Sequence, residues 1–181
     1  MRLRRLNGRF IVVITGVENA GKTTLGEALS QHLEWPLLEE AARTDAAVLD
    51  GRTSWDDLQR LQHRFIQQLS DIATSTPAPG IICDTGGLVL DIWAQAAFGR
   101  RLEATDEAVS MASLHLLLHT LPDWQPDPLR TLPALEDRLE LQGQYLNRLR
   151  NSGYTFGEVE VAPLRERRDL AAACIARHFD A

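Results

Sequence analysis

The chain has 181 residues, the size of one domain with a single substantial core. Its formal net charge of −6 argues against a general nucleic-acid binder, which would carry a basic face. No apolar stretch approaches the ~20 residues of a membrane span, and two cysteines are too few for a disulfide framework. We therefore expect one cytoplasmic domain over residues 1–181, with reduced cysteines and no nucleic-acid or membrane partner.

Strand and helix patterns alternate along the chain. Short apolar runs predict strands at residues 9–15, 35–38, 80–84, 113–118 and 154–161. Apolar residues at helical spacing predict helices at 55–74, 91–98, 133–150 and 164–178. This alternation predicts a three-layer α/β/α fold around a mainly parallel five-stranded sheet. Ligands of such sheets bind beyond the carboxyl ends of the strands.

The segment after the first strand carries a phosphate-binding P-loop. Its sequence is G-x-x-x-x-G-K-T followed by a helical pattern, and the residues expected to bind nucleotide are Gly16, Glu18, Asn19, Ala20, Gly21, Lys22, Thr23 and Thr24. The backbone N–H groups and the helix start would hold the phosphates. We expect Lys22 at the β- and γ-phosphates of ATP and the Thr23 hydroxyl at Mg²⁺.

Lys22 is also the only lysine of the chain, because the other 18 of the 19 basic residues are arginine. A compact ammonium suits so tight a loop better than a guanidinium. A general bias toward arginine explains the rarity of lysine elsewhere equally well.

An acid closes the third strand pattern. Asp84 follows the apolar run Ile81-Ile82-Cys83, the arrangement of the acid that holds Mg²⁺ in P-loop proteins. The alternative is an aspartate that only caps the next turn. With the P-loop upstream, we expect Asp84 to join Thr23 at the metal.

A proline-rich segment after the fourth strand has the character of a lid. It spans residues 121–130, and its end and the helix that follows carry Arg130 and Arg138. Such arginines can offset charge on a phosphoryl group during transfer. They can equally be solvated surface charges. Trp124 in this segment could stack on a planar ring.

Several motifs in succession resemble the kinase domain of the NadR family, the ribosylnicotinamide kinases, and its wider AAA relatives. The P-loop matches the family pattern G-x-E-S-x-G-K-[ST]-T-L except at Asn19. The other matches are Glu40-Ala41-Ala42-Arg43, Gln62, Asp84-Thr85, Trp93, Phe98-Gly99, Trp124, Asp127, Arg130 and Arg138. The resemblance spans most of the chain and implies the strand order 2-3-1-4-5.

The resemblance also implies an acceptor site and shows three departures. Glu40, Arg43, Trp124 and Asp127 would bind the acceptor. Departures from the family pattern occur at Ala41, Gly86 and Pro128. Gly86 replaces an acid, and loss of a charge-assisted hydrogen bond to a ribose would cost about 1.5–3 kcal/mol. That change weakens the case for nicotinamide riboside more than the case for phosphoryl transfer.

Two functions stay open at this point. The first is a kinase that transfers phosphate from ATP to a small nucleoside-like acceptor, with Lys22, Asp84, Arg130 and Arg138 as catalytic residues. The second is an ATPase or nucleotide-sensing module that acts through a partner protein. A GTPase is disfavoured, because guanine selection usually uses N-K-x-D and the only lysine lies in the P-loop.

Overall fold

The computed structural model describes residues 4–127 and 130–179, and its strands form one parallel sheet. The strands are β1 (Phe10–Thr15), β2 (Leu37–Leu38), β3 (Gly80–Asp84), β4 (Leu114–Leu118) and β5 (Phe156–Val159). Their order is β2-β3-β1-β4-β5, which confirms the predicted order. β1 is central and wholly buried, as its continuous apolar run requires. β2 and β5 lie at the edges of the sheet and are shorter than the predicted ranges 35–38 and 154–161.

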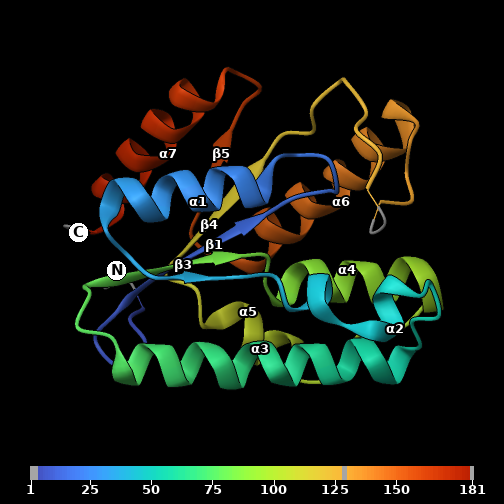
Figure 1. Ribbon diagram of the computed structural model, residues 1–181, viewed down its shortest axis with the longest axis horizontal. Coiled ribbons are helices and arrows are strands. Elements are labelled where there is room, and N and C mark those ends of the chain that lie inside the picture. Colours follow the sequence, from blue (N-terminus) through green and yellow to red (C-terminus); the bar gives the residue numbers. More distant parts are fainter. Residues whose placement is uncertain (1–3, 128–129, 180–181) are drawn as a thin grey trace.

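Helices cover both faces of this sheet, which confirms the three-layer fold (Figure 1). They are α1 (Lys22–Leu33), the 3₁₀ helix η1 (Ala41–Thr44), α2 (Ala46–Leu49), α3 (Trp55–Ser75), α4 (Gly87–Phe98), α5 (Thr105–Ser110), α6 (Leu135–Ser152) and α7 (Leu164–Phe179). α1 and α7 pack together on one face, whereas α3 and α5 lie on the other (Figure 1). Within residues 4–127 and 130–179, no helix has the length and apolar character of a membrane span.

Local sequence signals explain where α3 begins and why α4 begins early. Ser54 and Asp57 form a capping box at the start of α3, with the Ser54 hydroxyl accepting from the Asp57 N–H. α4 begins at Gly87, whereas apolar spacing predicted residue 91. Gly87 lies so close to α5 that a Cβ there would be 2.5 Å from the Cβ of Ala108. Tertiary packing therefore starts this helix at a residue of low helix propensity. The short helices η1, α2 and α5 were not predicted.

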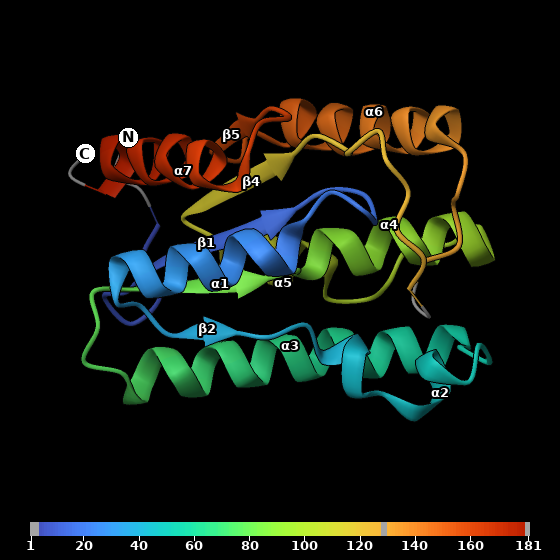
Figure 2. The same cartoon turned by 45° about the horizontal axis from the view of Figure 1, so that its top comes forward.

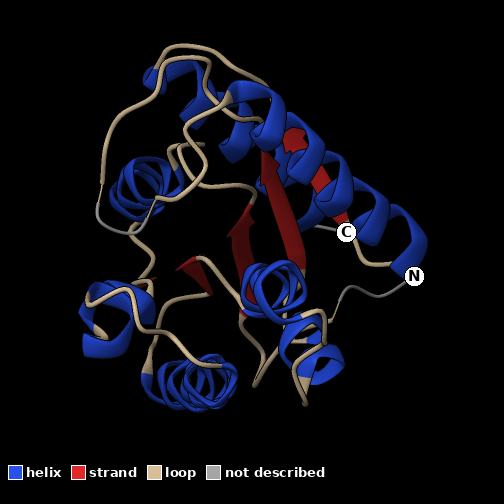
Figure 3. Ribbon diagram, turned by 90° about the vertical axis from the view of Figure 1, so that its right-hand side faces the viewer, coloured by secondary structure: helices blue, strands red, loops and turns tan. Residues whose placement is uncertain are grey.

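The strand register gathers the carboxyl ends of β1, β3 and β4 at one edge of the sheet. Ile14 lies opposite Asp84, and Thr15 lies opposite Leu117. Figure 3 looks toward this edge and shows strands enclosed by helices on both sides. Figure 2 shows the connection from β4 to α6 passing beyond the same edge toward α4. Segments that carry the predicted motifs therefore meet here.

Candidate nucleotide and acceptor site

The P-loop joins β1 to α1 through backbone that only glycine adopts readily. Gly16 has φ 132°, and a Cβ on it would lie 2.7 Å from the Leu118 carbonyl oxygen of β4. Gly21 has φ 77° and precedes the first residue of α1. These two glycines turn the chain so that α1 begins at Lys22, directly behind the loop. A helix start of this kind directs backbone N–H groups at an anion.

The Lys22 ammonium lies at the mouth of the loop. Its Nζ donates to the carbonyl oxygens of Gly16 at 3.0 Å and Val17 at 2.9 Å. Burial lowers the pKa of Lys22, while the carboxylates of Glu40 and Asp84 act in the opposite direction. The structure therefore holds a cation beside the loop, surrounded by acceptors that a phosphate oxygen could replace.

Two acids face this cation from β3 and the segment after β2. Asp84 is only 2% exposed, and its Oδ1 has no hydrogen-bond partner among the described residues. Burial raises the pKa of the Glu40 carboxyl, which Lys22 opposes. Glu40 Oε2 lies 3.2 Å from Arg43 Nε, and Arg43 Nη1 lies 3.5 Å from Asp127 Oδ2. Positive and negative side chains thus alternate in space from Lys22 of the P-loop through Glu40 and Arg43 to Asp127.

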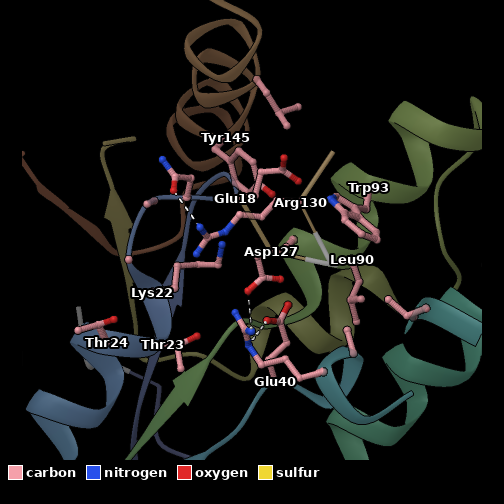
Figure 4. A pocket seen from close by; sticks show the side chains of 18 of the residues that line it. Glu18, Lys22, Thr23, Thr24, Glu40, Leu90, Trp93, Asp127, Arg130 and Tyr145 are labelled. Atoms are coloured by element: carbon pink, nitrogen blue, oxygen red, sulfur yellow. Dashed lines mark hydrogen bonds and ion pairs between the residues drawn. The ribbon is translucent and has the colours of Figure 1, made fainter. Parts of the chain in front are cut away.

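A cavity of about 260 Å³ adjoins these groups (Figure 4). Its polar lining comes from the P-loop between Glu18 and Thr24 and from Glu40, Arg43, Asp127 and Arg130. Its apolar lining comes from Val48, Leu58, Val89, Leu90, Trp93, Leu141 and Tyr145. A cavity with both charged and aromatic lining suits a small molecule that has a polar head and an apolar ring.

The segment after β4 that was predicted to be a lid, called the lid segment below and described over residues 121–127 and 130–134, is joined to the P-loop by Asn19. The amide nitrogen of Asn19 donates to the carbonyls of Leu121 and Asp123, the latter at 2.7 Å. The amide oxygen accepts from the N–H of Gln125 at 3.3 Å and from Arg130 Nη1 at 3.0 Å. Glu18, the neighbouring P-loop residue, accepts from two further N–H groups of the lid, those of Thr131 and Leu132.

Arg138 lies inside the lid rather than on the cavity wall. It is fully buried, and Nε donates to the Thr120 hydroxyl at 3.1 Å. Its other nitrogens donate to the carbonyls of Leu121, Pro122, Leu132 and Pro133. The ring of Trp124 faces the guanidinium with 5.1 Å between ring centroid and Cζ. Arg138 therefore bonds carbonyl groups of the lid segment, and its contact with a transferred phosphoryl group stays a prediction.

The structure brings most of the predicted site residues together. All of the P-loop positions from Glu18 to Thr24 line the cavity, with Glu40, Arg43, Asp127 and Arg130. Asp84 lies beside Glu40 on a smaller adjoining pocket. Trp124 does not line the cavity, and Trp93 of α4 takes a place there instead. Pro128 lies outside the described residues.

Apart from Trp93, sequence reasoning missed the apolar side chains that line the cavity. Leu141 and Tyr145 lie four residues apart on α6, a spacing that puts them on one helix face. Val89 and Leu90 belong to the early turns of α4 that apolar spacing did not predict. The α6 spacing was a readable signal of a buried face, but no sequence signal distinguished a cavity wall from the core.

The donor set fits magnesium bound together with phosphate. Within residues 4–127 and 130–179, no cluster of three or more His, Cys, Asp and Glu side chains could hold a metal alone. Mg²⁺ usually takes one or two protein oxygens and completes its shell with phosphate oxygens and water. Thr23 and the unpartnered Oδ1 of Asp84 are suitable oxygens.

The fold and this loop define a P-loop nucleotide-binding protein of the α/β class. A family model described as an AAA domain matches residues 11–167, and the chain belongs to that family. No curated protein matches the chain significantly.

Solved structures with a similar fold include the NadR protein and several kinases. The NadR protein in complex with NR superposes with a TM-score of 0.77 at 18% identity, over 98% of this chain and 52% of that one. Deoxyadenosine kinase from M. mycoides with bound dATP superposes with a TM-score of 0.68 at 14% identity, over 92% of this chain and 100% of that one. A gluconokinase from Sinorhizobium meliloti 1021 superposes with a TM-score of 0.57 at 22% identity, over 98% of this chain and 96% of that one. The chain spans about half the length of the NadR protein. These likenesses confirm the P-loop kinase fold.

Proposed function

We propose that the chain is a kinase that transfers the γ-phosphoryl group of ATP to a hydroxyl group of a small nucleoside-like acceptor. The observation that carries this proposal is the set of apolar side chains, among them Trp93 and Tyr145, that line the cavity together with the P-loop. An ATPase or a nucleotide switch needs no such lining beside its phosphate site, whereas a kinase must hold its acceptor there. The kinase folds of its structural neighbours support the same function.

The P-loop amides and Lys22 would bind the triphosphate, and Thr23 and Asp84 would hold Mg²⁺. The metal would neutralise charge on the phosphates. The acceptor hydroxyl oxygen attacks the γ-phosphorus, the bond to the bridging oxygen breaks, and ADP leaves. Arg130, which lines the cavity, would offset the charge that spreads over the transferred group.

A carboxylate must take the acceptor's proton. Glu40 is the better candidate, because it lines the main cavity and burial raises the pKa of its carboxyl. A raised pKa makes a carboxylate a stronger proton acceptor. Asp84, the acid expected from the sequence, lies at the β3 end, where metal binding would occupy it.

Nicotinamide riboside is one acceptor within this proposal, by likeness to the NadR protein solved with NR. The second candidate function is an ATPase or nucleotide sensor that works through a partner. Gly86 favours it, because the acid of the family motif is missing. We place the protein in the cytoplasm in either case, where its two free cysteines, Cys83 and Cys174, would stay reduced.

Product analysis tests the proposal. The protein is incubated with ATP, Mg²⁺ and a panel of nucleosides that includes nicotinamide riboside, and phosphorylated products are identified by mass spectrometry. We expect one acceptor class to be phosphorylated and Lys22→Ala to abolish the product while leaving the circular dichroism spectrum unchanged. ADP released at the same rate with and without every acceptor would favour the ATPase.

A further inference from the structure

Arg167 is a buried cation in the first turn of α7. Only 4% of it is exposed, while its neighbours Arg165 and Glu166 lie on the surface. α7 packs against α1, so this inward side chain reaches the helix that carries the P-loop. No sequence motif marked the residue, because one arginine among several in an amphipathic helix has no distinguishing pattern.

The guanidinium of Arg167 contacts the P-loop from behind. Nη2 donates to the carbonyl oxygen of Ala20 at 2.8 Å. Nη1 would lie 3.0 Å from a Cβ on Gly21, so the absence of a side chain at Gly21 leaves room for it. Nε is buried and has no hydrogen-bond partner among residues 4–127 and 130–179. The cation therefore lies against the Ala20–Gly21 peptide, whose residues line the cavity on the other side.

Among the described residues, no side chain supplies a counter-charge for this cation. In the described part of the chain, Arg167 takes part in no ion pair. Burial lowers the pKa of Arg167, and no neighbouring carboxylate offsets that effect. Arginine nevertheless stays protonated in proteins, so its charge is retained without a partner. An unpaired buried charge is unfavourable in the free protein.

The P-loop beside Arg167 is the predicted binding site of an anion, the polyphosphate of a nucleotide. A hydrogen bond to the Ala20 carbonyl polarises that peptide and strengthens its N–H, which belongs to Gly21, as a donor. We propose that Arg167 is a positioning residue of the nucleotide site, a cation behind the P-loop whose counter-charge is the polyphosphate of the bound nucleotide. The inference rests on the proposed function in taking the P-loop as a nucleotide polyphosphate site.

The proposal predicts opposite effects on stability and on binding. Arg167→Met removes the charge but retains an apolar stem, Arg167→Lys retains the charge, and Arg165→Met is a surface control on the same turn. For each variant, thermal unfolding is measured without nucleotide, and binding of ATP with Mg²⁺ is measured by calorimetry. We expect Arg167→Met to unfold at an equal or higher temperature than the wild type. We also expect it to bind ATP about tenfold more weakly or worse, which corresponds to about 1.4 kcal/mol.

Arg167→Lys should recover most of the lost affinity, and Arg165→Met should match the wild type in both measurements. If Arg167→Met does not fold, Arg167→Gln is compared with Arg167→Lys, and the glutamine variant should bind ATP at least tenfold more weakly. Unchanged ATP affinity in the uncharged variant, or a loss that lysine does not recover, overturns the inference. A wild-type protein that binds no ATP refutes the proposed function instead, before any variant is compared.

Discussion

Asn19 of the P-loop and Arg130 of the lid are joined by a hydrogen bond of 3.0 Å between Oδ1 and Nη1. With its other bonds to the lid, the Asn19 amide uses both its donors and its acceptor oxygen on this one segment. Its backbone has φ 59°, a conformation that asparagine tolerates better than most residues. The residue that departs from the family's P-loop pattern is therefore, with Glu18, one of those that connect the loop to the lid.

Replacing Asn19 by glycine should slow catalysis more than it weakens nucleotide binding. Glycine keeps the backbone conformation but removes the side-chain hydrogen bonds to the lid, among them the bond that holds Arg130 against the P-loop. We expect kcat to fall by about 10- to 100-fold, the usual effect of small misplacements near the reacting group, with a smaller change in KM for ATP. The matched control is Asn7→Gly, because Asn7 also has positive φ, at 49°, and its side chain donates to the Thr74 hydroxyl outside the site. Equal kcat in Asn19→Gly and the wild type would refute this role.

Restoring the family's acid at Gly86 should destabilise the fold. A Cβ at this position would lie 2.6 Å from Val13 Cγ1 and 3.3 Å from the Phe65 ring. Overpacking of this kind costs about 1–3 kcal/mol, and a buried carboxylate adds to it. We expect Gly86→Asp to lower the free energy of unfolding in urea by that amount or more.

Gly143→Asp provides the comparison, because no atom lies within 4 Å of a Cβ at that position on α6. It should unfold at the wild-type urea concentration or above it. If both aspartate variants are equally stable, the close packing around Gly86 does not explain the missing acid.

Removing the Arg138 guanidinium should loosen the lid. In Arg138→Met the four carbonyl groups that accept hydrogen bonds from this side chain would lose their donor. We therefore expect the free energy of unfolding to fall by an amount on the order of 3 kcal/mol. Trypsin cleavage after Arg130 should become faster, which gel analysis of timed digests would detect.

Arg150→Met is a suitable control for Arg138, since its side chain is 58% exposed on the same helix and its nearest acid, Glu158, lies 3.7 Å away. It should digest at the wild-type rate. Full stability of Arg138→Met together with lost turnover would instead support the role at the transferred phosphoryl group.

His115 should make the protein less stable in acid. It is 2% exposed, and burial lowers its pKa from 6.5 to about 4, although a bond to the Val109 carbonyl opposes this shift. Between these pH values the unfolded chain binds a proton at His115 that the folded chain does not. The free energy of unfolding therefore falls as the pH drops, by about 3 kcal/mol in total for this residue. Urea unfolding at pH 7 and pH 4 should show a smaller loss for His115→Leu than for the wild type, and equal losses would contradict the assignment.

Much of the fold was readable from the sequence because it depends on local patterns. The P-loop motif predicted the strand, turn and helix around residues 10–33, and the apolar runs predicted β3 and β4 closely. The order of the strands came from the resemblance, since pairing between distant strands leaves no local signal. The start of α4 was predicted wrongly because a close contact with α5 requires glycine at a position where propensity predicts a loop.

The site residues also fall into those that the sequence predicted and those that it did not. Its polar residues follow strand ends, so their convergence could be expected from a parallel sheet. Tyr145 and Arg167 could not be assigned to it, because each lies on a helix whose sequence pattern shows only that one face is buried. The sequence favoured Trp124 for the site because it lies in a proline-rich segment, whereas Trp93 of α4 is the tryptophan that lines the cavity.

Lys22 gives the molecule one practical property. Because no other residue of the chain has an amine side chain, reagents that acylate or reductively alkylate lysine have one internal target, and it lies beside the loop carbonyls of Gly16 and Val17. The yield of such a reaction would count empty sites directly. Nucleotide occupancy could thus be followed by mass spectrometry without a labelled ligand.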